Sequence, residues 1–99
     1  MNFSHKDPDE VEYLGFDLAA RLAAGETLLS VVFHVEVIDG ADPAAASMIL
    51  GAASIVGAIV RQKMGAGVAG VRYRISAHAV TSTGQTLVEA ATLEVRDVG

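Results

Sequence analysis

Alternating apolar and polar side chains give the clearest pattern, and it lies in the last third of the chain. After Gly65–Gly70, every second residue is apolar and the residues between are mostly polar; the two sets are Val71, Tyr73, Ile75, Ala77, Ala79 and Arg72, Arg74, Ser76, His78. Such alternation is typical of a half-buried strand. Thr81–Gln85 predicts a turn in which Gly84 takes a positive φ. A return strand then places Ala91, Leu93 and Val95 on one face, which predicts a closing antiparallel hairpin.

Two further strands are expected in the first half of the chain. Residues 11–18 place Leu14, Phe16 and Leu18 on one face, and Ala19–Gly25 reads as a single helical turn closed by Gly25. Thr27–Val37 alternates again, and its predicted core positions are Leu29, Val31, Phe33, Val35 and Val37. The turn residues Asp39–Pro43 end this strand.

The segment Ala44–Met64 is ambiguous between strands and a helix. It carries no charge before Arg61, but for a membrane span it is short and diluted by glycine and serine. In a helix, Gly51 and Gly57 would each cost about 1 kcal/mol relative to alanine. We therefore expect two strands, Ser47–Leu50 and Ile55–Met64, with a break near Gly51–Ser54, and a helix as the alternative.

These elements predict an all-β fold, a small immunoglobulin-like antiparallel β-sandwich of six or seven short strands. Residues 1–10, which contain Pro8, are expected to form an extended acidic arm that is flexible or docked on a partner, and residues 11–99 a single domain. Tyr73 follows Ala69-Gly70 at the spacing of the tyrosine corner of such sandwiches. An ordinary core tyrosine is the other interpretation.

Composition narrows the classes of function. The 99 residues are 52% apolar and 19% charged, which suits one folded domain. Alanine and valine dominate, so the core is expected to be thin and to need neighbouring subunits. Cysteine is absent, which excludes disulfides and thiolate metal sites. The N-terminus lacks the apolar stretch of a secretory signal, and a net charge of −5 argues against a general nucleic-acid binder.

Charge is distributed unevenly along the chain. Residues 1–60 carry nine acidic and two basic side chains, and residues 61–99 carry five basic and three acidic. One interpretation is a solvated surface. The other is that the acidic arm of one subunit meets a basic face of the next. The interaction residues predicted on this basis are Asp7, Asp9, Glu10, Arg61, Lys63, Arg72 and Arg74.

No catalytic, cofactor-binding or metal-binding constellation is found. His5, His34 and His78 lack a paired carboxylate or a third ligand at a suitable spacing, and both strand histidines are expected to point outward. The glycine-rich Gly65–Gly70 leads into a strand and lacks the spacing of a dinucleotide loop. Arg72-Tyr73-Arg74 would bury its ring, which makes a poor stacking platform for single strands.

Both ends of the chain carry short motifs that point to a known family. At the start these are Lys6-Asp7-Pro8-Asp9-Glu10-Val11, Tyr13, Asp17, Arg21-Leu22, Gly25 and Thr27-Leu28. At the end they are Gly65, Ala69-Gly70, Tyr73-Arg74-Ile75, Thr81-Ser82, Gly84-Gln85, Leu93 and Val95. With these residues the chain resembles the small immunoglobulin-like virion structural proteins encoded in the structural gene modules of tailed bacteriophages. The middle departs from the family pattern, which is rich in serine and threonine there.

The resemblance implies a non-enzymatic virion structural protein at the head surface, neck or tail, made in the host cytoplasm. We expect it to self-associate as a homo-oligomer and to dock onto other virion proteins, without cofactor, small-molecule substrate, nucleic acid or membrane as partners. The uncharged Ala44–Val60 would then be covered by an interface, because a monomer that exposed it should aggregate. The alternative is an adhesin-like surface- or carbohydrate-binding sandwich module.

Overall fold

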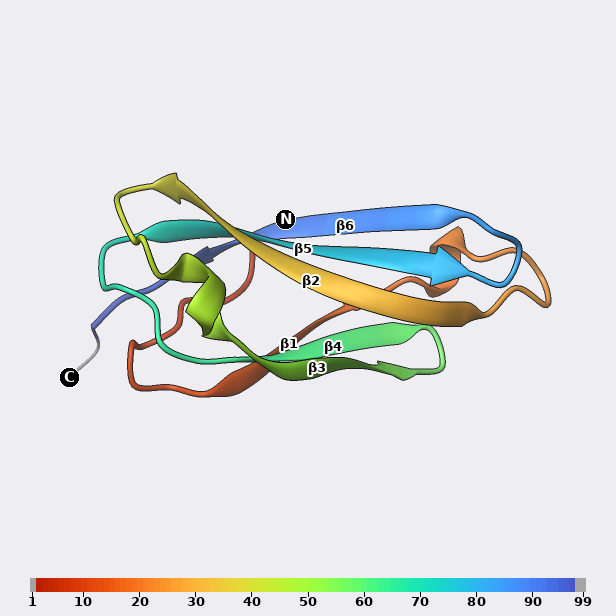
Figure 1. The fold of residues 1–99 in the computed structure, drawn as a ribbon, viewed down its shortest axis with the longest axis horizontal. Helices are drawn as coiled ribbons and strands as arrows, with labels where there is room; N and C mark the ends of the chain where they lie inside the picture. The colour runs from red at the N-terminus through yellow and green to blue at the C-terminus, as the bar shows by residue number, and fades with distance from the viewer. Residues whose placement is uncertain (1, 98–99) are drawn as a thin grey trace.

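A computed structural model of the chain, which describes residues 2–97, shows six strands stacked in two layers (Figure 1). The predicted arm and domain also include residue 1 and residues 98–99, which lie outside this description. Two short 3-10 turns, η1 and η2, connect the layers. The elements in chain order are β1 (Glu12–Asp17), η1 (Ala19–Arg21), β2 (Leu28–Asp39), η2 (Ala45–Met48), β3 (Ile49–Val56), β4 (Ile59–Met64), β5 (Arg72–Thr81) and β6 (Thr86–Glu94).

Each layer is an antiparallel three-stranded sheet. The strand orders are β1-β4-β3 and β2-β5-β6. In chain order these six strands correspond to strands B to G of an immunoglobulin sandwich, whose sheets contain B-E-D and C-F-G. The prediction of an all-β sandwich is therefore confirmed.

The core lies between the two sheets and is built from the alternating positions identified in the sequence. Val71, Tyr73, Ile75, Ala77 and Ala79 are all buried, whereas Arg72, Arg74 and His78 are exposed on the opposite face of β5 and Ser76 is half-buried there. In β1, Leu14 and Phe16 are buried, as is Leu18 just beyond the strand. The ring of Phe16 lies between those of Phe3 and Phe33, with centroids 5.3 and 6.1 Å away. Gly84 in the closing hairpin takes the expected positive φ, 87°.

Tyr73 forms a tyrosine corner. Its hydroxyl accepts a hydrogen bond from the backbone N–H of Val68 at 2.9 Å and donates one to the Asp42 carboxylate at 2.8 Å. Burial raises the pKa of the Tyr73 phenol, and the Asp42 carboxylate raises it further. The bond from Val68 closes back onto the chain just upstream of β5, which is the geometry of the corner. Of the two interpretations of Tyr73, the corner is confirmed.

Leu29 is not a core residue. The sequence predicted it on the inner face of β2, but its side chain is 64% exposed and Leu28 is buried instead. The register with β5 shifts between Leu28 and Ser30, so a bulge reverses the alternation at that point. Beyond the bulge Phe33 is buried and Val31, Val35 and Val37 are half-buried, as expected for the inner face.

The ambiguous segment contains two strands, and the helix alternative is wrong. The predicted positions of these strands need correction, however, because β3 runs through Gly51–Ser54 and the chain turns at Gly57-Ala58. The predicted break is a register shift within the ladder between Leu50 and Ser54. Gln62 of β4 compensates for this shift: its buried side-chain amide donates to the carbonyl oxygens of Leu50 at 3.2 Å and Gly51 at 3.1 Å.

Candidate docking surfaces

The outer face of the β1-β4-β3 sheet combines an exposed aromatic ring with two cations. Tyr13 of β1 is 57% exposed, and the guanidinium carbon of Arg61 lies 4.6 Å from its ring centroid. Lys63 pairs with Tyr13 across the β1–β4 ladder, and opposite residues share a face. The exposed apolar side chains of this sheet are Leu50, Val56 and Ile59. We call this surface the Arg61 face.

The outer face of the β2-β5-β6 sheet carries two histidines. The rings of His34 and His78 meet edge to face with centroids 4.7 Å apart, and both are exposed as the sequence predicted. Around them lie the exposed apolar side chains of Val32, Val80 and Val88. Towards the end of β2, a shallow groove of about 330 Å³ is lined by Ile38, Arg72 and Glu94 among others, and Arg74 borders a second hollow beside it. We call this surface the His78 face.

The four predicted basic interaction residues do not form one cluster. Arg61 and Lys63 lie on β4 and point away from the core on one side of the sandwich. Arg72 and Arg74 lie on β5 and point away from it on the other side. Their closeness in the sequence is lost because the chain crosses from one sheet to the other between β4 and β5. The chain thus has two separate outer faces that each carry a pair of cations.

The predicted acidic interaction residues gather around a lysine of their own chain. The ammonium of Lys6 is buried and donates to the backbone carbonyl oxygens of Asp7 at 2.8 Å and Ala66 at 2.6 Å. Burial lowers the pKa of Lys6, and the carboxylates of Glu12, Glu10, Asp7 and Asp9 act in the opposite direction. The acidic arm is therefore partly balanced from within the chain.

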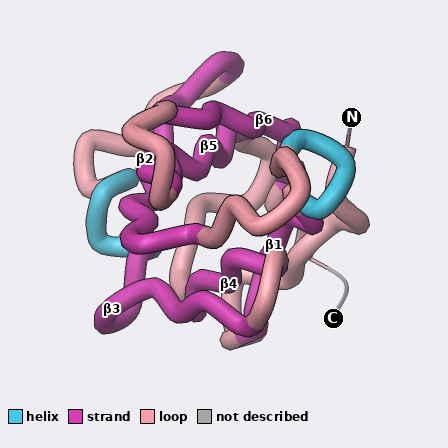
Figure 2. Tube along the Cα trace, turned by 90° about the vertical axis from the view of Figure 1, so that its right-hand side faces the viewer, coloured by secondary structure: helices cyan, strands magenta, loops and turns pink. Residues whose placement is uncertain are grey.

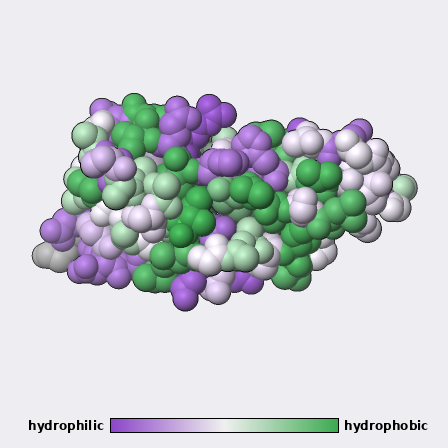
Figure 3. Space-filling view, in the orientation of Figure 1, coloured by the Kyte–Doolittle hydropathy of each residue, from purple (hydrophilic) through white to green (hydrophobic). Residues whose placement is uncertain are grey.

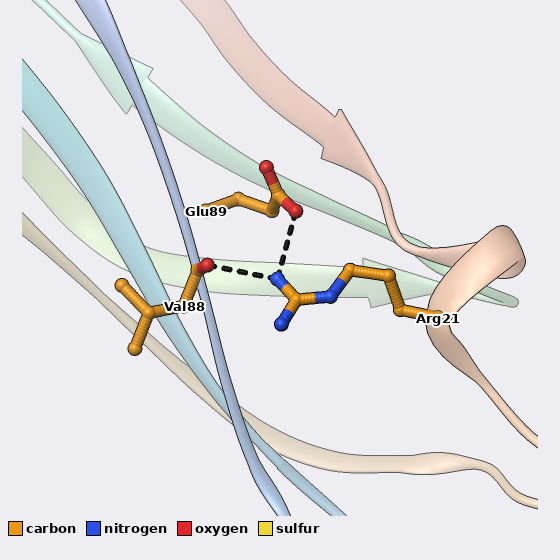
Figure 4. A network of polar contacts seen from close by, with 3 residues as sticks. All are labelled: Arg21, Val88 and Glu89. Carbon is orange, nitrogen blue, oxygen red and sulfur yellow. Dashed lines mark hydrogen bonds and ion pairs between the residues drawn. The ribbon is translucent and has the colours of Figure 1, made fainter.

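The sandwich is closed along the side where β1 and β6 form the sheet edges. The arm runs parallel to β6, where Phe3 N–H donates to Thr92 O at 2.9 Å and Lys6 N–H to Glu94 O at 3.0 Å. Arg21 of η1 donates from Nη1 to the Val88 carbonyl oxygen and to Glu89 Oε1, both at 2.8 Å (Figure 4). Viewed along the sandwich, η1 spans the gap between β6 and β1 (Figure 2). No sequence pattern indicated this role of Arg21.

The opposite side, where β2 and β3 form the edges, is more open. Its inner residues are only half-buried; they are Val31, Val35 and Val37 of β2 and Ile49, Ala53 and Ile55 of β3. The 3-10 turn η2 covers one end of this side, and its Met48 is fully buried. Figure 3 shows this side, with hydrophobic surface running through the middle of the molecule.

The described residues contain neither a metal-binding cluster nor a helix that could span a membrane. Among residues 2–97, no three His, Asp or Glu side chains come together in a way that could hold a metal ion. No helix in this part of the chain is long and apolar enough to span a bilayer. Apart from the histidines, Tyr13 is the one exposed aromatic side chain among residues 2–97, and no observation favours the adhesin-like alternative, which stays a prediction.

These features define a small β-sandwich whose chemistry lies in its surfaces and edges, as in a structural or assembly protein. A family model described as the podophage GP4 fiber-tail adaptor protein gp77 matches residues 6–94, and the chain belongs to this family. The predicted kinship with phage virion structural proteins is therefore confirmed, although the family description does not name an immunoglobulin-like group. The chain is a virion component of the tail. No match was found among the curated proteins or among the solved structures.

Proposed function

We propose that this chain is a non-enzymatic adaptor that links a fibre to the phage tail through the Arg61 face and the His78 face, and that its copies self-associate. The family supports the fibre and the tail as neighbours. The observation that carries the proposal is the placement of Arg61 with Lys63 and of Arg72 with Arg74 on opposite outer faces. A linker needs two surfaces that can be occupied at the same time, and these face away from each other.

Each face has the composition of a docking surface. Exposed aliphatic residues surround the cations on both sides, and Tyr13 adds a ring to the Arg61 face. Apolar contact area would supply affinity, and the cations would select acidic partners and set the register. On a neighbouring copy of the chain, the exposed carboxylates of Asp9 and Glu10 are acidic groups that these cations could bind. Asp7 stands beside them in the same arm and belongs to this proposed contact.

The test is to reverse the charge on one face at a time. The variants R61E/K63E and R72E/R74E are tested as purified chains for binding to fibreless tails and to isolated fibres at low and high salt. We expect each pair to lose one of the two interactions and to retain the other, with the larger defect at low salt, where charges are least screened. The variant A20E/A24E, which adds negative charge at exposed positions around η1, is the control.

Two outcomes would contradict the proposal. If both double variants bind tails and fibres as the unsubstituted chain does, the faces are not the docking surfaces. Self-association is tested separately by analytical ultracentrifugation, where we expect an oligomer. A single monomeric species at high concentration would remove that part of the proposal and leave the adaptor role standing.

A further inference from the structure

Strand β2 has a long edge that nothing in the described chain pairs with. Its regular ladder with β5 covers Ser30–Val37, between two bulges at Leu28/Ser30 and Val37/Asp39. Within residues 2–97, no backbone hydrogen bond from outside its own sheet reaches this stretch. By contrast, the arm covers the edge of β6. β2 therefore presents unpaired N–H and C=O groups over eight residues.

Apart from η2, which covers one end of this side, this edge also lacks the features that normally prevent sheets from joining. Edge strands are usually protected by lysine, by proline, by inward-pointing charge or by bulges within the strand. The stretch SVVFHVEV of Ser30–Val37 contains no lysine, arginine or proline, and its one carboxylate, Glu36, points outward. Both bulges lie outside it. Its inner valines, Val31 and Val35, are only half-buried in the single chain.

Geometry restricts how two copies could meet along this edge. A two-fold axis pairs β2 with itself antiparallel, and opposite residues must point to the same side of the joined sheet. The two-fold axis must therefore pass beside a residue that pairs with its own copy, and it cannot pass between two successive residues. Within the regular stretch Ser30–Val37, only an axis at Phe33 or at His34 allows seven residues of each strand to pair. A centre at His34 sets the two His34 rings opposite each other and Glu36 opposite Val32. A centre at Phe33 avoids both.

We propose that β2 pairs antiparallel with β2 of a second copy around Phe33, which joins the two β2-β5-β6 sheets into one six-stranded sheet. This pairing rests on the proposed self-association and gives it a site. Val31 then lies opposite Val35 of the partner subunit, so that each half-buried valine covers the other. Ser30 lies opposite the partner subunit's Glu36, whose carboxylate can accept its hydroxyl hydrogen bond. Val32 lies opposite the partner subunit's His34 on the His78 face.

Disulfide trapping tests both the dimer and its register, because the natural chain has no cysteine. V32C and H34C are made as single variants and mixed under mild oxidation. Directly opposite Cβ atoms lie about 4.5–5.5 Å apart and diagonal ones about 7–8 Å, which is too far for a disulfide. We expect the mixed V32C–H34C dimer to form in at least tenfold excess over either homodimer. V88C, on the same face but on the other edge strand, is the exposed control.

Other outcomes overturn the proposal. A predominant H34C homodimer would place the axis at His34, and cross-linking no greater than that of V88C would show that this edge is not the interface. A second measurement avoids cysteine: V32K should shift the sedimenting species to monomer, whereas V88K should not. Ultracentrifugation could show oligomers while the cysteine variants do not cross-link above the V88C level and V32K leaves the oligomers intact. In that case only the β2 pairing fails. If the unsubstituted chain is monomeric, the proposed self-association fails with it.

Discussion

The hydroxyl of Tyr73 donates a hydrogen bond to the carboxylate of Asp42, 31 positions earlier in the chain, at 2.8 Å. The same hydroxyl accepts from the backbone N–H of Val68 at 2.9 Å. One buried side chain thus ties the loop before β5 to the loop after β2. Both loops carry the chain from one sheet to the other, so this contact helps to fix how the two sheets stack.

Removing this hydroxyl should destabilise the fold. Y73F keeps the ring in the core but removes two part-buried hydrogen bonds, one of them to a carboxylate, and together these are worth about 1–3 kcal/mol. We expect a decrease of that size in the free energy of unfolding in urea. Y13F, on an exposed ring, should change it by less than about 0.5 kcal/mol. Equal stability of the two variants would mean that the corner contributes nothing beyond the ring.

The amide of Gln62 should be required for the irregular part of β3. Q62L removes the donor to the Leu50 and Gly51 carbonyl oxygens at a buried position. We expect a loss of about 1–3 kcal/mol in the free energy of unfolding. Q85L, at an exposed hairpin position, is the matched control. Faster amide hydrogen exchange confined to β3 would locate the effect, and unchanged stability of Q62L would refute this role.

Glu26 should make stability depend on pH. Hydrogen bonds from the hydroxyls of Thr81 and Thr83 and from the Ala23 N–H hold the pKa of this carboxyl below its ordinary value. A pKa that is lower in the folded state stabilises the fold above the unfolded-state pKa, and this contribution is lost as pH falls through the folded-state pKa.

The variant E26Q tests this dependence. It should be less stable than the natural chain at pH 7, and the difference should shrink as pH falls below about 4.3, the ordinary value for glutamate. Chemical unfolding at a series of pH values measures it. S4A, at an exposed position of the arm that carries no titratable group, should run parallel to the natural chain. A stability difference for E26Q that stays constant down to pH 2.5 would contradict the assignment.

Gly67 should tolerate a methyl group less well than Gly70, although both have positive φ values of 97° and 86°. A Cβ at Gly67 would lie 2.9 Å from Val95 Cγ2, whereas one at Gly70 would meet nothing within 4 Å. Left-handed backbone alone costs a non-glycine residue about 1–2 kcal/mol. We expect G70A to show that cost and G67A to exceed it in thermal unfolding. Equal melting temperatures would show that Val95 moves aside freely.

Where adjacent positions differ strongly in polarity, the sequence predicted the structure to the residue. Every second residue from Val71, just before β5, to Ala79 is apolar and buried, and in β1 Leu14 and Phe16 are buried while Tyr13 and Asp17 are exposed. The pattern failed where both faces carry small apolar residues. In Ala44–Met64 no sequence feature favours a turn at Gly57-Ala58 rather than at Gly51–Ser54, so the predicted break was misplaced.

The sequence also did not predict the β-bulge in β2 or which sheet each strand belongs to. Alternation cannot reveal an extra residue, and the bulge beside Leu29 moved that side chain from the core to solvent. Nor can it show which sheet a strand joins. Arg61 and Arg72 therefore appeared to form one basic cluster, whereas the structure separates them by the thickness of the sandwich. The roles of Arg21, Gln62 and Glu26 depend on partners distant in the chain.

By itself the sequence determined that this chain is an all-β domain, which alternate residues face its core, and that Tyr73 stands where a corner can form. Local alternation sets these properties, because burial of a side chain in a strand depends on its parity. Only the tertiary structure decided which faces carry the cations, which side the arm and Arg21 close, and which edge is left unpaired. These follow from contacts between residues far apart in the chain, and no local pattern encodes them.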